Sequence, residues 1–276
     1  INKNIATWIE ERVKFPRTMV DCIVPNTKKL PNEVEEKFKD NSLVICEPYR
    51  DWYIENKSDL LKNDLFHEGI KFVDNVEFYE SIKLKILNAS HSALAYLGLL
   101  LGYKYVHEAI GDELCYNFIN NYLDREVIPT IQQQDNFDLI QYKKDVLKRF
   151  RNHFLNHKLE QIGMDGSLKL PIRIINTFKN KDENTEYVYT YIIIACWILF
   201  LKQNNINKFN YAVSDPMFDD LFNIVNNEKN TVDKIINLKN IFDLSEKYKT
   251  ILKNNVKIQI NSIETLNFKN FLSQLN

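Results

Sequence analysis

The spacing of apolar residues divides the chain near residue 79. Before that point, two short β-branched runs at 19–24 and 42–46 lie between prolines, a pattern typical of short strands joined by loops. From residue 79 onward, apolar side chains recur at intervals of three and four, which is the period of an amphipathic helix. This spacing predicts helices over 79–101, 113–124, 137–156, 167–179, 186–203, 216–226 and 262–274. We therefore expect a mainly α protein with a short α/β segment in front.

Apolar length and charge argue against membrane and nucleic-acid partners. The most apolar stretch, Tyr187–Leu201, is shorter than the roughly 20 residues that a bilayer-spanning helix needs. We expect it to form a central buried helix. Lys and Arg total 36 against 37 Asp and Glu, for a net charge of -1, so no overall field attracts the chain to nucleic acid or to an anionic membrane.

Glycine and cysteine content limit the chemistry further. The chain has six glycines, and none of them form a G-x-G-x-x-G or Walker sequence, so these residues cannot build a glycine-rich phosphate cradle. The four cysteines lie far apart without a C-x-x-C pair. That distribution indicates reduced thiols in the cytoplasm, not a zinc or redox site.

One predicted helix carries a cluster of polar residues. At about 100° per residue, four polar side chains fall within an arc of about 140°: Glu80, Lys83, Asn88 and His91. Metal-free hydride transfer needs a base for the hydroxyl proton and donors that hold the oxygen. Periodicity alone favours a simpler interpretation, in which Lys83 extends to solvent and His91 is an ordinary core histidine. Lys85 lies about 200° around the helix from Lys83, so its loss is expected to be nearly silent for any activity of this face.

A family resemblance changes that balance. Residues 83–92, KLKILNASHS, resemble the K-x-R-x-L-N-x-x-H-S signature of the mannitol dehydrogenase family of polyol-specific long-chain dehydrogenases. Other segments are similar to family motifs in the same order along the chain: FPRTMVDCIVP at 15–25, WYIE at 52–55, EVIPT at 126–130, RFRN at 149–152, QIGMDGSLKLPIR at 161–173 and DPM at 215–217. Together these matches are far more specific than any single motif.

The resemblance implies two domains and a nicotinamide cofactor. Family members join an N-terminal Rossmann domain to a helical C-terminal substrate domain. Residues 1–76 would then be the tail of the dinucleotide-binding domain, and residues 77–276 the helical substrate and catalytic domain. The chain would begin after the glycine loop, as a fragment inactive without its partner Rossmann domain. That domain would hold most of the NAD or NADP, with Asp21 as a candidate cofactor contact in this chain.

The resemblance also implies the central catalytic roles. Lys83 would be the general acid/base, and Asn88 and His91 would hold the substrate oxygen. The reaction would interconvert a secondary alcohol and a ketone of an open-chain sugar acid or polyol, with no metal. The alternative is a non-catalytic helical binding module that keeps the fold.

Four further residues are implied on the substrate side: Glu80, Gln161, Lys169 and Arg173. Glu80 matches an acidic position that helps proton exchange with water, and Lys169 matches a contact to a substrate hydroxyl. Asp165, Lys169 and Arg173 are also spaced like ordinary exposed i,i+4 ion pairs, which leaves a structural role open. Gln161 stands where some mannitol-active members carry arginine. With glutamine at this position, the motif resembles that of the fructuronate reductase (mannonate oxidoreductase) branch. Fructuronate and mannonate are therefore favoured over fructose and mannitol as substrates.

Two histidines allow a different interpretation. His153 and His157 lie four residues apart within a predicted helix, a spacing that can ligate a metal. No acidic third ligand supports a metal site there. We therefore expect a substrate-side or structural role for His157.

Overall fold

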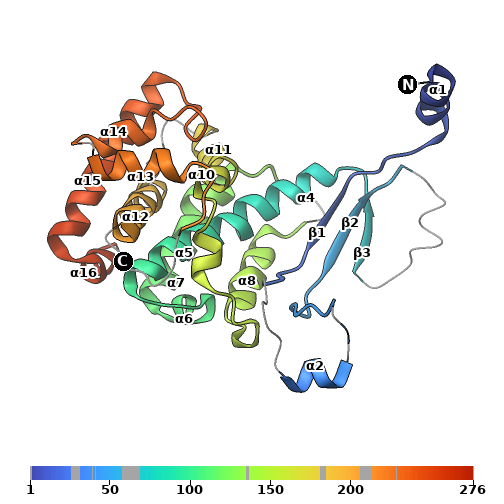
Figure 1. The fold of residues 1–276 in the computed structure, drawn as a ribbon, viewed down its shortest axis with the longest axis horizontal. Coiled ribbons are helices and arrows are strands. Elements are labelled where there is room, and N and C mark those ends of the chain that lie inside the picture. The colour runs from blue at the N-terminus through green and yellow to red at the C-terminus, as the bar shows by residue number, and fades with distance from the viewer. Residues whose placement is uncertain are drawn as a thin grey trace. The chain divides into compact units, whose positions relative to one another are not determined.

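The computed structural model describes residues 2–25, 32–38, 40, 42–57, 69–134, 137–180, 185–205, 213–227 and 229–275. They fall into two compact units, Ile1–Lys83 and Leu84–Asn276. Figure 1 shows the strands in the blue N-terminal part of the chain and helices through the green, yellow and red parts.

The first unit is built on a three-stranded sheet. Its strands are β1 (Thr18–Asp21), β2 (Asp51–Glu55) and β3 (Ile70–Val73). The central strand β2 pairs antiparallel with β1 and parallel with β3. The unit also contains the helices α1 (Lys3–Arg12), α2 (Asn32–Phe38) and α4 (Val76–Ile82).

The strand predicted at 42–46 is wrong. Residues 43–47 have no regular secondary structure. The carboxylate of Glu47 accepts a hydrogen bond from the backbone N of Ile23 at 2.6 Å, while the Glu47 backbone N donates to the Ile23 carbonyl at 3.2 Å. A side chain thus takes a hydrogen bond that a neighbouring strand would otherwise supply. The run at 19–24 belongs to a strand only as far as Asp21.

The second unit is helical, and its elements are η1 (Lys83–Asn88, whose first residue belongs to the first unit), α5 (Ala89–Leu101), α6 (Val106–Gly111), α7 (Glu113–Tyr122), η2 (Leu123–Val127), η3 (Ile128–Thr130), α8 (Leu139–Phe150), η4 (His153–Leu155), α9 (Leu159–Gly163), α10 (Gly166–Leu170), η5 (Pro171–Ile175), α11 (Asn176–Lys179), α12 (Val188–Asn205), α13 (Phe218–Asn227), α14 (Thr231–Ile236), α15 (Glu246–Leu266) and α16 (Phe268–Ser273). The predicted mainly α fold is confirmed. After residue 79, pairing between extended segments is limited, in the described part of the chain, to one bridge between Tyr105 and Lys158.

The core of this unit surrounds α12, as predicted. Every residue from Ile192 to Ile198 is fully buried, because this helix is apolar on all sides and needs neighbours all around. It packs against α5, α13 and α15. The helical stretch Val76–Leu101 is long and apolar enough to cross a membrane, but 72% of its most apolar window is buried inside the protein. That degree of burial is typical of a core helix.

Two predicted helices have different limits in the structure. The helix expected over 137–156 ends at Phe150. The helix expected over 262–274 is replaced by the end of α15 and by the short helix α16. Pro171 lies at the start of a π-helical turn between α10 and α11, as expected for a proline at a kink.

Candidate active site

His91 lies in the most completely buried helix of the candidate site. Every residue of α5 from Ala89 to Leu99 is buried, and His91 is 6% exposed. Its ring stacks on Phe150 of α8, with centroids 4.2 Å apart and planes 19° apart. The ring of His157 meets it nearly at a right angle, with centroids 5.3 Å apart. Contacts from two aromatic rings therefore restrict the orientation of the His91 imidazole.

His157 reaches this position because the chain leaves the helical path after Phe150. The side chain of Asn152 caps the short helix η4, and Asn156 adopts a left-handed conformation with φ 44°. His153 and His157 consequently do not share a helix, and the predicted helical pair of histidines is wrong. Instead, the His157 carbonyl accepts a hydrogen bond from Val106 N at 2.9 Å.

Arg173 connects η5 to the helix that carries His91. One guanidinium nitrogen, Nη1, donates to the hydroxyl of Ser92 at 3.0 Å and lies 3.4 Å from the backbone oxygen of Asn88. The sequence separations are 81 and 85 residues. Of the predicted residues, Arg173 on η5 is thus bonded to the continuous stretch of η1 and α5 that carries Asn88 and His91.

Lys169 lies one turn before Arg173 and is partly buried. Its Nζ donates to the carbonyl of Ile162 at 3.1 Å and lies 3.8 Å from Asp165. The i,i+4 ion pair expected from the spacing is therefore present. It is not an ordinary exposed pair, because the Lys169 side chain is only 20% exposed. Gln161 is half-buried in the neighbouring helix α9.

The start of α10 is held by a residue distant in sequence. Asp215 accepts hydrogen bonds from the backbone N of Ser167 at 2.8 Å and from its hydroxyl at 2.5 Å. The preceding Gly166 has no room for a side chain, because a Cβ there would lie 2.5 Å from Nε1 of the buried Trp197. These contacts fix the first turn of the helix that carries Lys169.

The cluster combines neutral imidazoles with cations. Burial lowers the pKa of His91 well below its usual value, and His157 and Arg173 add to the effect. Burial, followed by the charge of Lys169, lowers the pKa of His157 to about 4. Burial and the nearby Arg173 also lower the pKa of Lys169. A guanidinium stays charged in proteins, so near neutral pH the cation of Arg173 acts on an uncharged His91 ring, which the uncharged His157 ring contacts. This arrangement suits an oxygen atom that gains negative charge during a reaction.

Lys83 and Glu80 lie in the first unit. Lys83 is half-buried, and its Nζ donates to the Val20 carbonyl at 2.5 Å. Glu80 is exposed. The stretch Lys83–Asn88 is a π-helical turn, which has more residues per turn than an α-helix. The arc calculated at 100° per residue therefore does not hold through this stretch, although π-helical turns are frequent at functional sites.

Lys85 is more constrained than expected. Its Nζ donates to the carbonyl of Thr130 at 3.1 Å, and burial lowers its pKa. The loss of Lys85 would remove a hydrogen bond between η1 and η3, so we expect it to affect stability even if turnover is unchanged. Its role in the structure is to stabilise the fold.

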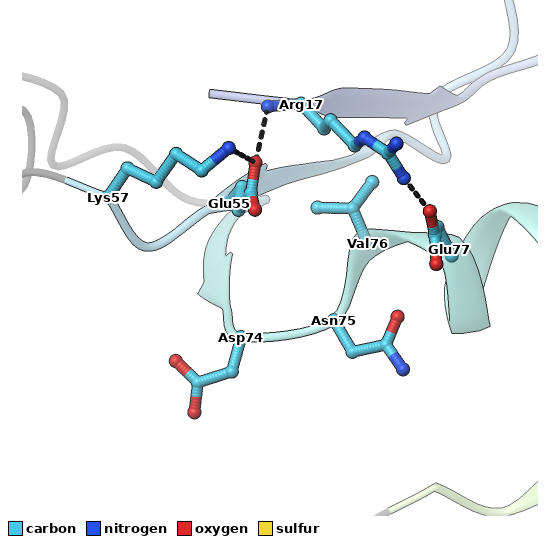
Figure 2. Close-up of a pocket in the computed structure, with 7 residues that line it drawn as sticks. All are labelled: Arg17, Glu55, Lys57, Asp74, Asn75, Val76 and Glu77. Carbon is cyan, nitrogen blue, oxygen red and sulfur yellow. Dashed lines mark hydrogen bonds and ion pairs between the residues drawn. The ribbon is translucent and has the colours of Figure 1, made fainter. Parts of the chain in front are cut away.

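Asp21 and a separate pocket complete the first unit. Asp21 is 1% exposed at the end of β1, in register with Asp51 of β2. A polar pocket of about 330 Å³ is lined by Arg17, Glu55, Lys57, Asp74, Asn75, Val76 and Glu77. Figure 2 shows two ion pairs in its lining, Glu55 with Lys57 and Arg17 with Glu77. None of the predicted site residues lines it.

Three contributors to the site had no predicted role. Ser92 and Phe150 lie inside matched motifs, and Asp215 lies in the DPM segment. The sequence signal was therefore present, but only tertiary contacts show what each residue touches.

Known proteins share this architecture. The mannitol dehydrogenase C-terminal domain matches residues 75–263, and the mannitol dehydrogenase Rossmann domain matches residues 1–65. D-mannonate oxidoreductase of Escherichia coli is 33% identical over 235 residues, 84% of this chain and 48% of the relative. A mannitol dehydrogenase of Saccharomyces cerevisiae is 30% identical over 221 residues, 78% of this chain and 44% of the relative.

A solved structure extends the likeness to three dimensions. The ternary complex of Pseudomonas fluorescens mannitol 2-dehydrogenase with NAD and D-mannitol superposes with a TM-score of 0.86 at 28% identity, covering 99% of this chain and 56% of that one. The chain spans about half the length of the curated relatives it matches. Because the C-terminal domain match alone takes in more than half of its residues, the chain belongs to the mannitol dehydrogenase family of oxidoreductases.

Proposed function

We propose that the protein carrying this chain transfers hydride between a nicotinamide nucleotide and a secondary alcohol or ketone of an open-chain sugar acid or polyol. The observation that supports this most is a cluster of polar residues that are buried or half-buried in the helical unit: His91, His157, Lys169 and Arg173. Such a cluster is costly to bury and is retained where polar ligand atoms are bound.

In the proposed reaction, Lys83 is the general acid/base. The neutral amine of Lys83 accepts the hydroxyl proton as the carbon–hydrogen bond breaks, and the ammonium returns that proton when the ketone is reduced. Asn88 and His91 donate hydrogen bonds to the substrate oxygen. This oxygen carries its largest negative charge in the transition state between alcohol and ketone. Bound NAD or NADP supplies the hydride acceptor or donor.

The cofactor fits this chain only in part. The sequence has no glycine-rich turn that would hold a pyrophosphate, so we assign no pyrophosphate contact to these residues. Asp21, buried at the end of β1, remains our candidate cofactor contact. We propose residues 1–76 as the tail of the dinucleotide-binding domain and 77–276 as the substrate domain.

The residues proposed for the substrate site bind hydroxyl and carboxylate groups. Lys169 and Gln161 would bind hydroxyls along the chain, Arg173 would add positive charge, and Glu80 would exchange the proton of Lys83 with water. The Gln161-containing motif favours fructuronate and mannonate over fructose and mannitol. No disulfide joins the four cysteines, which supports the cytoplasm as the working compartment.

Oxidation of NADH and NADPH tests the proposal. The protein that carries this chain is assayed with fructuronate, tagaturonate and fructose, and we expect turnover with at least one of them. Binding of these compounds without any turnover with either nucleotide would favour the alternative, a non-catalytic helical binding module.

A further inference from the structure

Two buried nitrogen atoms of neighbouring histidines lack a hydrogen-bond partner. They are Nε2 of His91 and Nδ1 of His157, and neither is bonded to any residue that the structure describes. Burying a polar atom without a partner is unfavourable, so each such atom in a folded protein needs an explanation.

The separation of the two rings suggests the explanation. Their centroids are 5.3 Å apart and their planes differ by 83°. Two imidazoles joined by an N–H···N hydrogen bond of about 3 Å have ring centres about 5 Å apart, since each nitrogen lies about 1 Å from its ring centre. A hydrogen bond of this kind places no requirement on the angle between the planes. The observed ring separation therefore matches that of two imidazoles joined by such a bond.

Both rings have the protonation state that such a bond requires. A neutral imidazole has one N–H donor and one acceptor nitrogen, whereas a cation has two donors. The charged groups acting on His91 are Arg149 from α8 and Lys169 and Arg173 from α10 and η5, all of them cationic. They oppose a positive charge on His91, and Lys169 opposes one on His157.

Backbone hydrogen bonds hold the main chain at His157. The His157 carbonyl accepts from Val106 N at 2.9 Å, and Leu159 N donates to the Lys104 carbonyl at 3.0 Å. His157 is thus flanked by two hydrogen bonds to one neighbouring segment. Phe150 supports the His91 ring by stacking on it.

We propose that His157 is a positioning residue that hydrogen-bonds through Nδ1 to Nε2 of His91, fixing the tautomer and orientation of the His91 ring. Nδ1 of His91 is then the nitrogen that meets the substrate oxygen. The effect on turnover rests on the proposed function, whereas the hydrogen bond itself does not.

Nuclear magnetic resonance of the whole chain with ¹⁵N-labelled histidine tests the bond directly. With only five histidines in the sequence, each imidazole can be assigned by single substitution. We expect His91 and His157 to be neutral at pH 7, with complementary tautomers and a coupling between the two bonded nitrogens. Independent tautomers without such a coupling would overturn the proposal, even if the protein is an active dehydrogenase.

Kinetics of three variants test the consequence. His157→Phe keeps an aromatic ring but removes the nitrogens, and we expect kcat to fall tenfold or more with a smaller change in KM. His157→Asn retains a polar atom near the Nδ1 position and should recover a large part of the loss. His153→Phe, at an exposed histidine, is the matched control and should leave kcat unchanged. Equal kcat for wild type and His157→Phe would contradict the positioning role.

Discussion

The buried carboxyl of Glu126 should make the stability of the helical unit depend on pH. Glu126 is 1% exposed in η2. It accepts hydrogen bonds from the backbone N of Tyr189 at 2.6 Å, and from the backbone N and hydroxyl of Thr190 at 2.8 and 2.7 Å, at the start of α12. Burial nevertheless outweighs these bonds and raises the pKa of Glu126 from 4.5 to about 7.

The direction of the effect follows from that shift. Because the pKa of Glu126 is higher in the folded chain than in the unfolded chain, the protonated form stabilises folding. This contribution is complete below the unfolded pKa of 4.5 and is lost as the pH rises through about 7. A difference of about 2.5 pH units, at about 1.36 kcal/mol per unit, corresponds to a loss of about 3 kcal/mol at most.

Urea unfolding of wild type and Glu126→Gln at several pH values measures this loss. We expect the free energy of unfolding of wild type, relative to the variant, to fall by about 2–3 kcal/mol between about pH 4.5 and 8. The buried histidines affect both proteins equally and cancel in the difference. Glu113→Gln, at an exposed position, is the control and should show no such trend. Parallel curves for wild type and Glu126→Gln would show that burial does not raise the pKa of Glu126 in the folded chain.

Two substitutions should weaken the start of α10. Gly166→Ala places a Cβ against Nε1 of Trp197, so we expect thermal or urea unfolding to show a loss of about 1–3 kcal/mol from overpacking; an unchanged midpoint would mean that the indole can move away. Asp215→Asn removes the carboxylate that accepts from both donors of Ser167. We expect it to lower the free energy of unfolding by about 1–3 kcal/mol and to raise KM, because the turn before Lys169 loosens. Stability and KM equal to wild type would show that the contact is unimportant.

The helical body is predictable because its apolar spacing is strong. α12 is apolar on every side, and its burial follows directly from that pattern. By contrast, most of α15 is invisible to this reasoning. Only about one residue per turn is buried, among many Lys and Asn residues: Leu252, Val256, Ile260 and Ile263. This weak apolar pattern can be recognised as a helix face only once α15 is seen to pack against α12.

The candidate site shows where sequence reasoning ends. A motif can point to His91, but the π-helical turn before it changes the register of the helix face, and no spacing rule signals that turn. The hydrogen bond from Arg173 to Ser92 joins residues 81 positions apart. The approach of His157 depends on the left-handed turn at Asn156, where the periodicity predicted that the helix continues.

The most direct test of the proposed activity compares Lys83→Ala with Lys85→Ala in the protein that carries this chain. With the preferred sugar acid or polyol and nucleotide, we expect Lys83→Ala to lower kcat by about 100- to 10,000-fold and to alter its pH profile, because the proton acceptor is lost. Lys85→Ala should lose stability, through its bond to Thr130, yet keep kcat close to wild type. Equal losses of kcat in the two variants, or a wild-type kcat and pH profile in Lys83→Ala, would contradict the assignment of Lys83 as the general acid/base.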